Sequence, residues 1–452
     1  MTKAPQTGKL QADAPPRPRK SGRGKTASRR AAAAMLAAIE RGKTLDEARD
    51  RLQDLPANDR AFADLMVLTA LRHYGEIEAT LAPCLARPLP ARPHLARALL
   101  YIGAVQLLYL DTPAHAAINE TVAATGRREQ PFRGLINAVL RRLDREAAAL
   151  RVADPLRAWP DWLAASWQAH YGAPTTQTIA RTMQTHAPTD LCFISEDEAD
   201  AFIAALPDTL KASHLTPKNL RLSGALSVPE LPFYDKGTWW VQDIAATLAA
   251  QILAVPTGAE ALDLCAAPGG KTLQMAAAGA QVTALDMSAQ RLARLQANLA
   301  RTGLSANTIC AALEDWSPQD RQWPYVLLDA PCSATGTIRR HPDLPLHRKA
   351  GHIAGAARAQ EKLLAKAAAL TAPGGQLVYC VCSLQPQEGE AIAAGFLADT
   401  PHFATVPVTP DMLPDGLQAA VTQEGWLRTH PAMLAETGGC DGFFIARFTR
   451  TG

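Results

Sequence analysis

The segment Leu262-Asp-Leu-Cys-Ala-Ala-Pro-Gly-Gly-Lys-Thr272 carries the clearest fold signal in the chain. Its pattern indicates a short apolar strand, a glycine-rich turn and the first turn of a helix. Gly269 and Gly270 let the backbone turn tightly and leave amide groups free at the helix N-terminus. Such amides suit a phosphate or a carboxylate, so the segment predicts an α/β domain with an anion-binding turn.

Known nucleotide-binding motifs do not fit this turn. Gly270-Lys271-Thr272 matches the end of the phosphate loop Gly-x-x-x-x-Gly-Lys-[Ser/Thr], but Cys265 occupies the place of its first glycine. The dinucleotide fingerprint Gly-x-Gly-x-x-Gly is absent as well. For the glycines alone, a tight turn without a ligand remains an alternative.

Asp286 ends the next predicted strand, within Val282–Ser288. An acid at the tip of the second strand is placed to accept both hydroxyls of a bound ribose. Together with the glycine turn, Asp286 therefore predicts a nucleoside-containing cofactor. By itself, Asp286 could instead cap the helix that starts near Ser288.

The sequence around this segment alternates between strand and helix patterns from about residue 236 to 452. Such alternation predicts a parallel sheet covered by helices on both faces, with ligands at the carboxyl ends of the strands. The expected strands are Ala261–Leu264, Gln281–Leu285, Val326–Leu328 and Gln376–Cys380, and the expected helices are Thr272–Ala278, Ala289–Arg301 and His352–Leu370.

Two cysteines follow strands of this predicted sheet. Cys332 lies in Leu328–Asp343 and Cys382 in Leu377–Leu384, so both should reach the same ligand-binding edge. Two inert buried cysteines are the alternative, and Cys380, inside an apolar run, fits that description. We predict no metal site, because Cys380-x-Cys382 lacks a second ligand pair at suitable spacing.

Helices dominate the preceding part of the chain. Residues 27–150 lack any period-2 run and predict an all-α domain. Residues 151–235 predict a small linking subdomain, with a helix at Trp162–Tyr171 and a strand at Asp190–Ile194. The helices expected in the first domain are Ala31–Glu40, Asp59–Tyr74, His94–Leu110, His115–Thr125 and Phe132–Leu150.

The charge of the chain is concentrated at its start. The first thirty residues hold nine lysines and arginines against one acid, Asp13, although the whole chain carries only +3. Residues 1–26 have almost nothing to bury, so we expect a disordered basic tail. It serves either as an electrostatic tether for RNA or as a solubilising tail.

Composition predicts a soluble, cytoplasmic protein of two or three domains. Eight cysteines in 452 residues are too sparse for a disulfide framework, which favours a reducing compartment. The start of the chain has no apolar stretch like that of a secretory signal. The longest apolar run, Leu99–Leu110, is interrupted by Gln106 and is too short to span a bilayer.

The sequence resembles the bacterial RsmB (Fmu/Sun) family of ribosomal RNA cytosine-5 methyltransferases. Three motifs carry this resemblance: Leu262–Thr272, Leu328–Asp343 and Tyr379–Ser383. The resemblance runs from Trp240-Val-Gln-Asp243 to Gly442-Phe-Phe-Ile-Ala-Arg447. It extends to the helical part, where Asp59–Phe62, Ala114–Glu120 and Leu135–Arg142 look like the NusB-like domain fused to this enzyme. The resemblance implies a Rossmann-like class I methyltransferase domain that uses S-adenosylmethionine, preceded by an all-α NusB-like domain that binds RNA.

The resemblance also implies a role for each site residue. Cys382 would add to carbon 6 of the cytosine and so activate carbon 5, a case of covalent catalysis. Cys332 would then help to remove the carbon 5 proton so that Cys382 can leave. Asp329 would hold the cytosine edge and the methionine end of the cofactor, and Asp286 its ribose. The cofactor's amino-acid part would lie on the backbone of Cys265, Ala266, Ala267, Pro268, Gly269, Gly270 and Lys271.

Two further expectations concern charge. Arg339 and Arg340 follow the Cys332 loop and should contact RNA phosphates, with a solvated charge pair as the alternative. Lys271 would lower the pKa of the Cys382 thiol if the fold brings the two close.

The chain departs from the family pattern in three places. Ala312 replaces an acid that often binds adenine, and Glu314 or Asp315 is a candidate substitute. Pro386-Gln-Glu-Gly389 stands where Pro-Glu-Glu-Asn is usual, and Cys380 occupies a place that is commonly Ala or Ser.

Three functions remain to be separated. The favoured one is methylation of small-subunit (16S) ribosomal RNA by a monomer without metal or membrane association. The same chemistry on transfer RNA fits the motifs equally well. A pure RNA-binding or antitermination factor would follow if the helical domain carried the function, but such a factor needs neither cysteine.

Overall fold

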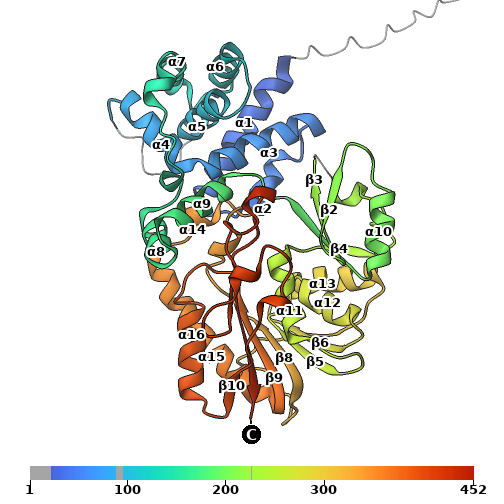
Figure 1. Cartoon of the computed structure of the whole chain (residues 1–452). Coiled ribbons are helices and arrows are strands. Elements are labelled where there is room, and N and C mark those ends of the chain that lie inside the picture. Colours follow the sequence, from blue (N-terminus) through green and yellow to red (C-terminus); the bar gives the residue numbers. More distant parts are fainter. Residues whose placement is uncertain (1–21, 88–94, 225–226, 452) are drawn as a thin grey trace, which may run out of the picture.

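The computed structural model describes residues 22–87, 95–224 and 227–451 (Figure 1). The first domain is all-α, as predicted. Helix α5 is apolar nearly all round and lies buried at its centre, against α1, α3, α6 and α7. The helices are α1 (Gly22–Ile39), α2 (Leu45–Arg49), α3 (Ala57–Arg72), α4 (Tyr74–Leu81), α5 (Leu95–Leu108), α6 (Ala114–Ala123) and α7 (Arg133–Leu150).

The boundary expected at residue 27 falls inside a helix. Helix α1 begins at Gly22, and the Thr26 hydroxyl donates to Glu120 Oε2 over 3.0 Å. The rest of the predicted basic tail, residues 1–21, lies outside the described residues.

Residues 155–241 contain three α-helices and a small antiparallel sheet. Helices α8 (Asp161–Tyr171) and α9 (Ala173–Gln184) lead into a sheet of order β2-β3-β1-β4, on which α10 (Glu196–Ala204) packs. Only α8 and β1 were predicted, because β2 is largely exposed and β4 is three residues long. The strands are β1 (Thr189–Phe193), β2 (Lys211–Thr216), β3 (Asn219–Ser223) and β4 (Trp239–Val241).

The C-terminal domain contains the predicted parallel sheet. Its strand order is β10-β12-β9-β8-β5-β6-β7, and the five strands from β9 to β7 run parallel. An antiparallel edge formed by β10, β11 and β12 was not predicted. The strands are β5 (Glu260–Leu264), β6 (Gln281–Asp286), β7 (Asn307–Cys310), β8 (Trp323–Asp329), β9 (Thr371–Val381), β10 (Phe403–Thr405), β11 (Leu427–Arg428) and β12 (Phe444–Arg450).

Helices cover both faces of this sheet, which makes it doubly wound. Helices α15 (Ala350–Leu370) and α16 (Glu390–Asp399) bury their apolar residues on one face. Helices α11 (Ile244–Leu253), α12 (Gly270–Ala277) and α13 (Ala289–Thr302) cover the other face. The short α14 (Leu344–His347) follows the Cys332 loop. Within the described ranges, no helix combines the length and apolar character needed to cross a membrane.

The helical parts contact the loop that follows Cys382. Tyr171 Oη donates to the carbonyl oxygen of Leu384 over 2.9 Å, and Ser166 Oγ donates to Gln385 Oε1 over 2.6 Å. Both donors lie on α8. The backbone amide of Leu45, at the start of α2, donates to Asp343 Oδ2 over 2.9 Å. Residues from the first 171 positions therefore contact the loops at the carboxyl edge of the large sheet.

Candidate active site

The glycine turn after β5 has the conformation that its sequence predicts. Gly269 has a φ of 108° and is the N-cap of α12. A Cβ at this position would lie 2.1 Å from Leu295 Cδ1, so only glycine fits. No side chain of the described residues caps the N-terminus of α12, so its first amides are placed to meet an anionic group. These features fit the carboxylate of a methionine-type cofactor.

Asp286, at the tip of β6, accepts hydrogen bonds from two backbone amides. Ala267 N donates to its Oδ2 over 3.1 Å and Ser288 N to its Oδ1 over 2.9 Å. Arg291 pairs with it at 3.3 Å. Ser288 is itself the N-cap of α13, since its hydroxyl accepts from Arg291 N. The alternative in which Asp286 caps this helix is therefore not needed, and Asp286 joins the glycine turn to the second strand.

Lys271 pairs with Asp329 and not with Cys382. Its Nζ lies 2.8 Å from Asp329 Oδ2 at the tip of β8. The thiol of Cys380 donates to the other oxygen, Oδ1, over 3.5 Å. Asp329 is partly exposed, which leaves it able to accept from a ligand. The expected effect of Lys271 on the Cys382 thiol has no support in this arrangement.

Asp263, on β5 beneath this pair, is completely buried. Burial raises its pKa to about 7, although a hydrogen bond from Thr272 Oγ1 to Oδ2 opposes that shift. Its other oxygen, Oδ1, has no partner within the described chain and can carry the proton.

Cys332 and Cys382 meet at the carboxyl edge of the sheet, as predicted. Their Sγ atoms are 3.5 Å apart. The turn Thr335–Thr337 contacts the Cys382 backbone, because Gly336 N donates to the Cys382 carbonyl oxygen over 3.0 Å. A Cβ on Gly336 would lie 1.9 Å from the Gly442 carbonyl oxygen, so this turn requires glycine.

The contact between the two thiols affects the ionisation of Cys332. The hydrogen bond with Cys382, followed by burial, raises the pKa of Cys332 well above its usual value. Either sulfur atom can be the donor in this contact.

Glu388 joins the two cysteine loops, and the sequence assigned it no role. It is fully buried, and its Oε1 accepts from Ser333 N over 2.8 Å and from Gln360 Nε2 over 3.2 Å. Its Oε2 accepts from the hydroxyls of Ser333 and Ser383, the residues that follow the two cysteines. The only signal in the sequence was an acid six positions after Cys382, within the segment that departs from the family pattern.

The expectation that Arg339 contacts RNA needs correction. Its side chain is completely buried and pairs with Asp243 and with Asp441, the latter at 3.0 Å. A guanidinium enclosed in this way cannot reach a phosphate. Arg340 also pairs with Asp441, but its side chain keeps 35% of its accessible surface, so an RNA contact stays open for it.

The remaining sequence candidates lie at the edges of the site. Glu314 and Asp315 follow β7 and are exposed, one strand away from Asp286. Among the described residues, no group of three His, Cys, Asp or Glu side chains is arranged to hold a metal ion.

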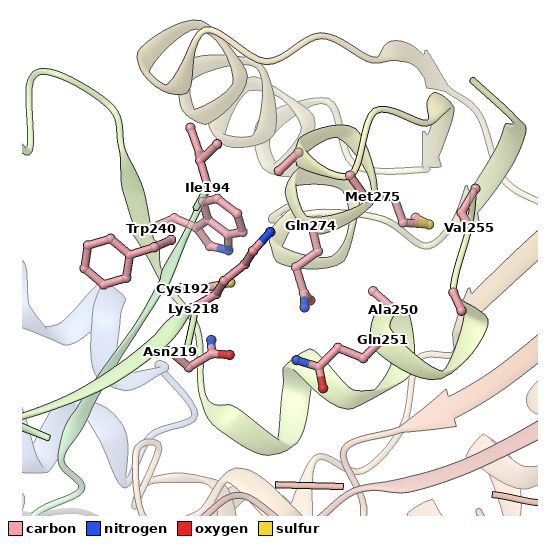
Figure 2. Close-up of a pocket in the computed structure, with 14 residues that line it drawn as sticks. Cys192, Ile194, Lys218, Asn219, Trp240, Ala250, Gln251, Val255, Gln274 and Met275 are labelled. Atoms are coloured by element: carbon pink, nitrogen blue, oxygen red, sulfur yellow. The ribbon is translucent and has the colours of Figure 1, made fainter. Parts of the chain in front are cut away.

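A separate hollow of about 210 Å³ lies between the small sheet and helices α11 and α12 (Figure 2). Lys218 and Gln274 extend into it from opposite sides. Its lining includes none of the predicted catalytic or cofactor residues, so it is distinct from the candidate active site.

The doubly wound sheet, the glycine turn and the acids at the tips of β6 and β8 define a Rossmann-like methyltransferase. The 16S rRNA methyltransferase RsmB/F family matches residues 250–449, and the NusB family matches residues 26–145. The chain is 34% identical to the ribosomal RNA small subunit methyltransferase B of Pseudomonas putida, over 93% of this chain and 98% of that one. The chain therefore belongs to the ribosomal RNA small subunit methyltransferase B family.

Solved structures show the same fold. The crystal structure of PH0851 superposes with a TM-score of 0.75 at 22% identity, over 94% of this chain and 98% of that chain. That of NSun6 from Pyrococcus horikoshii with SFG gives a TM-score of 0.57 at 17% identity, over 65% of this chain and 98% of that chain.

Proposed function

We propose that this protein transfers a methyl group from S-adenosylmethionine to carbon 5 of a cytosine in small-subunit (16S) ribosomal RNA, through a covalent bond between Cys382 and the base. The observation that carries the proposal is the pair of thiols 3.5 Å apart at the carboxyl edge, beside Asp329 and the glycine turn. Cytosine carbon 5 is too weak a nucleophile to accept a methyl group directly, and a thiolate that adds at carbon 6 removes that obstacle.

The bound cofactor supplies an electrophilic methyl group. The first amides of α12 would hold its carboxylate, and Asp329 its amino group. Asp286 would hold the ribose, and the exposed Glu314 and Asp315 are candidates for the adenine contact. The family membership and the neighbouring structure with SFG support this assignment.

The protein residues act in two stages. First, the Cys382 thiolate adds to carbon 6, while Asp329 accepts a hydrogen bond from the exocyclic amine of the cytosine. After methylation, the carbon 5 proton must leave to a base, and the electron pair of that bond restores the carbon 5–carbon 6 double bond as Cys382 departs. We assign this second stage to Cys332: once its own proton has passed to solvent, its thiolate would accept the carbon 5 proton. Its raised pKa stems first from its hydrogen bond with Cys382, and that bond is lost once the Cys382 sulfur is bonded to carbon.

The substrate assignment to 16S ribosomal RNA rests on the family to which the chain belongs. Transfer RNA would present the same base, and the site chemistry does not separate the two carriers. The test is methyl transfer from labelled cofactor to 16S ribosomal RNA and to transfer RNA, followed by nucleoside analysis. We expect 5-methylcytidine in ribosomal RNA. Another methylated nucleoside, or a preference for transfer RNA, would contradict the proposal.

A further inference from the structure

Arg72, at the end of α3, is a buried cation without a partner. Only 7% of its surface is exposed, and burial lowers its pKa to about 10. Within the described ranges it forms no ion pair or hydrogen bond, and its Nε is enclosed without an acceptor. Buried charges are normally paired, because an unpaired ion loses its hydration without compensation. An unpaired arginine that faces a cavity therefore suggests a missing anion.

Arg72 lines a cavity of about 200 Å³ between all three parts of the chain. Arg49 and Leu68 come from the helical domain, residues 186–190 and Val241 from the region of the small sheet, and Arg340 from the catalytic domain. The cavity is large enough for a phosphate group with the edge of a ribose. Val241 is 48% exposed, which gives the sugar an apolar surface.

Of the arginines that line the cavity, Arg72 is the one that forms no ion pair with a described residue, although the charge of Asp64 acts on it. The two carboxylates that line it are already neutralised, Asp190 by Arg221 at 2.7 Å and Asp243 by Arg339. Arg49 pairs with Asp46 and Asp64, and Arg340 pairs with Asp441. His186 supplies no cation, because burial and then Arg72 lower its pKa.

The cavity is also linked to the catalytic cysteines. Arg340 N donates to Thr337 O over 3.0 Å, in the same turn whose Gly336 contacts the Cys382 backbone. The Arg340 guanidinium lies close enough to Cys382 that the thiol contributes to its raised pKa. An anion between Arg72 and Arg340 would therefore lie beside the target nucleotide.

We propose that Arg72 and Arg340 bind one backbone phosphate of the RNA, close to the target cytidine, in this cavity. The proposal rests on the proposed function, since it takes RNA as the substrate. In this arrangement the helical domain helps to position the target nucleotide. Arg72 on α3 and Arg340, which follows the turn Thr335–Thr337, bind the same phosphate.

The first test compares Arg72→Gln with Arg321→Gln, which removes an exposed charge at the opposite, amino-terminal edge of the sheet. We expect Arg72→Gln to bind a 16S RNA fragment about 10- to 100-fold more weakly, the range of one charge-assisted hydrogen bond. Its slope of log K against log salt should fall by about 0.7. The KM for RNA should rise by a larger factor than kcat falls. Arg321→Gln should match the wild type in all three measurements.

Thermal unfolding separates this role from a structural one. Removing an unpaired buried charge should leave the Tm of the RNA-free protein equal or higher, whereas a structural arginine would lower it. If Arg72→Gln does not fold, Arg340→Gln is measured in its place against the same RNAs.

A scan with single methylphosphonate linkages identifies the phosphate. One neutral linkage near the target should weaken binding to the wild type and have no further effect on Arg72→Gln, because the two changes remove the same contact. Equal RNA affinity and salt slope in the wild type and the variant would overturn the proposal. The proposal would also be overturned if the effects of the neutral linkage and of Arg72→Gln on RNA binding were additive at every linkage. It would be overturned as well if inorganic phosphate stabilised only the wild type while the two proteins bound RNA equally. Binding and unfolding do not depend on which atom is methylated, so they remain informative even if the proposed function fails.

Discussion

Cys332 Sγ lies 3.5 Å from Cys382 Sγ, although fifty positions separate the two residues. The proximity follows from the parallel pairing of β8 with β9, which places both strand ends at one edge of the sheet. Glu388 then fixes the loops that follow both strands, through Ser333 and Ser383. Two thiols at this distance can both reach one bound base.

Glu388→Gln should lower kcat by roughly 100-fold, because displacements of about 1 Å in a catalytic group can cost this much. In this variant an NH2 group replaces one carboxylate oxygen. The NH2 group cannot accept the hydrogen bonds that the Ser333 and Ser383 hydroxyls donate to Glu388. Cofactor affinity should stay near that of the wild type, since Glu388 lies away from the glycine turn. The exposed neighbour Gln387 provides the control, as Gln387→Ala should retain activity. Full activity of Glu388→Gln would remove Glu388 from this positioning role.

Asp286→Ala should weaken cofactor binding by about 1.5–3 kcal/mol, the value of hydrogen bonds to a charged group. Calorimetry measures this directly. Ser288→Ala removes the cap of α13 and should reduce stability by about 1 kcal/mol without a comparable loss of cofactor affinity. If both variants bind the cofactor like the wild type, Asp286 only organises the turn.

Asp263 predicts a pH dependence of stability. Its pKa is about 7 in the folded protein and near 4 in the unfolded chain, so the folded state holds an extra proton between these values. The free energy of unfolding should therefore receive a favourable contribution below pH 4 that is lost as the pH rises through 7, by at most about 1.4 kcal/mol per pH unit. Asp263→Asn should lack this component in denaturant unfolding measured from pH 5 to 8. An identical pH profile in the variant would show that Asp263 stays ionised.

Deletion of residues 2–21 should flatten the salt dependence of RNA binding. This segment holds five lysines and arginines, and each lost phosphate contact lowers the slope by about 0.7 for single strands. The deletion ends before α1, so stability should not change. An unchanged slope would limit the segment to a solubilising role.

The sequence predicted the parallel sheet and the meeting of the two cysteines because both depend on local strand patterns and on a general property of parallel strands. It did not predict the contacts that complete the site. Glu388 matters because it is buried and hydrogen-bonded to both cysteine loops, and Arg72 because it is buried without an ion-pair partner among the described residues. The order of residues in the chain reveals neither property. Arg339 appeared equivalent to Arg340 in sequence, yet one is enclosed by Asp243 and Asp441 and the other is partly exposed. The strand β12 was not predicted, and nothing in its sequence indicates that it runs antiparallel to β9.

The central claim is that Cys382 forms the bond to the base and that Cys332 serves its release. The most direct measurement is denaturing electrophoresis of Cys332→Ala after reaction with RNA and S-adenosylmethionine. We predict a covalent protein–RNA adduct that contains methylated cytosine, that ribonuclease removes, and that is absent from Cys382→Ala and from the double variant. The adduct should accumulate because attack by Cys382 stays fast while elimination becomes slow. Normal turnover of Cys332→Ala without an adduct, or an adduct that forms with Cys382→Ala instead, would contradict the account.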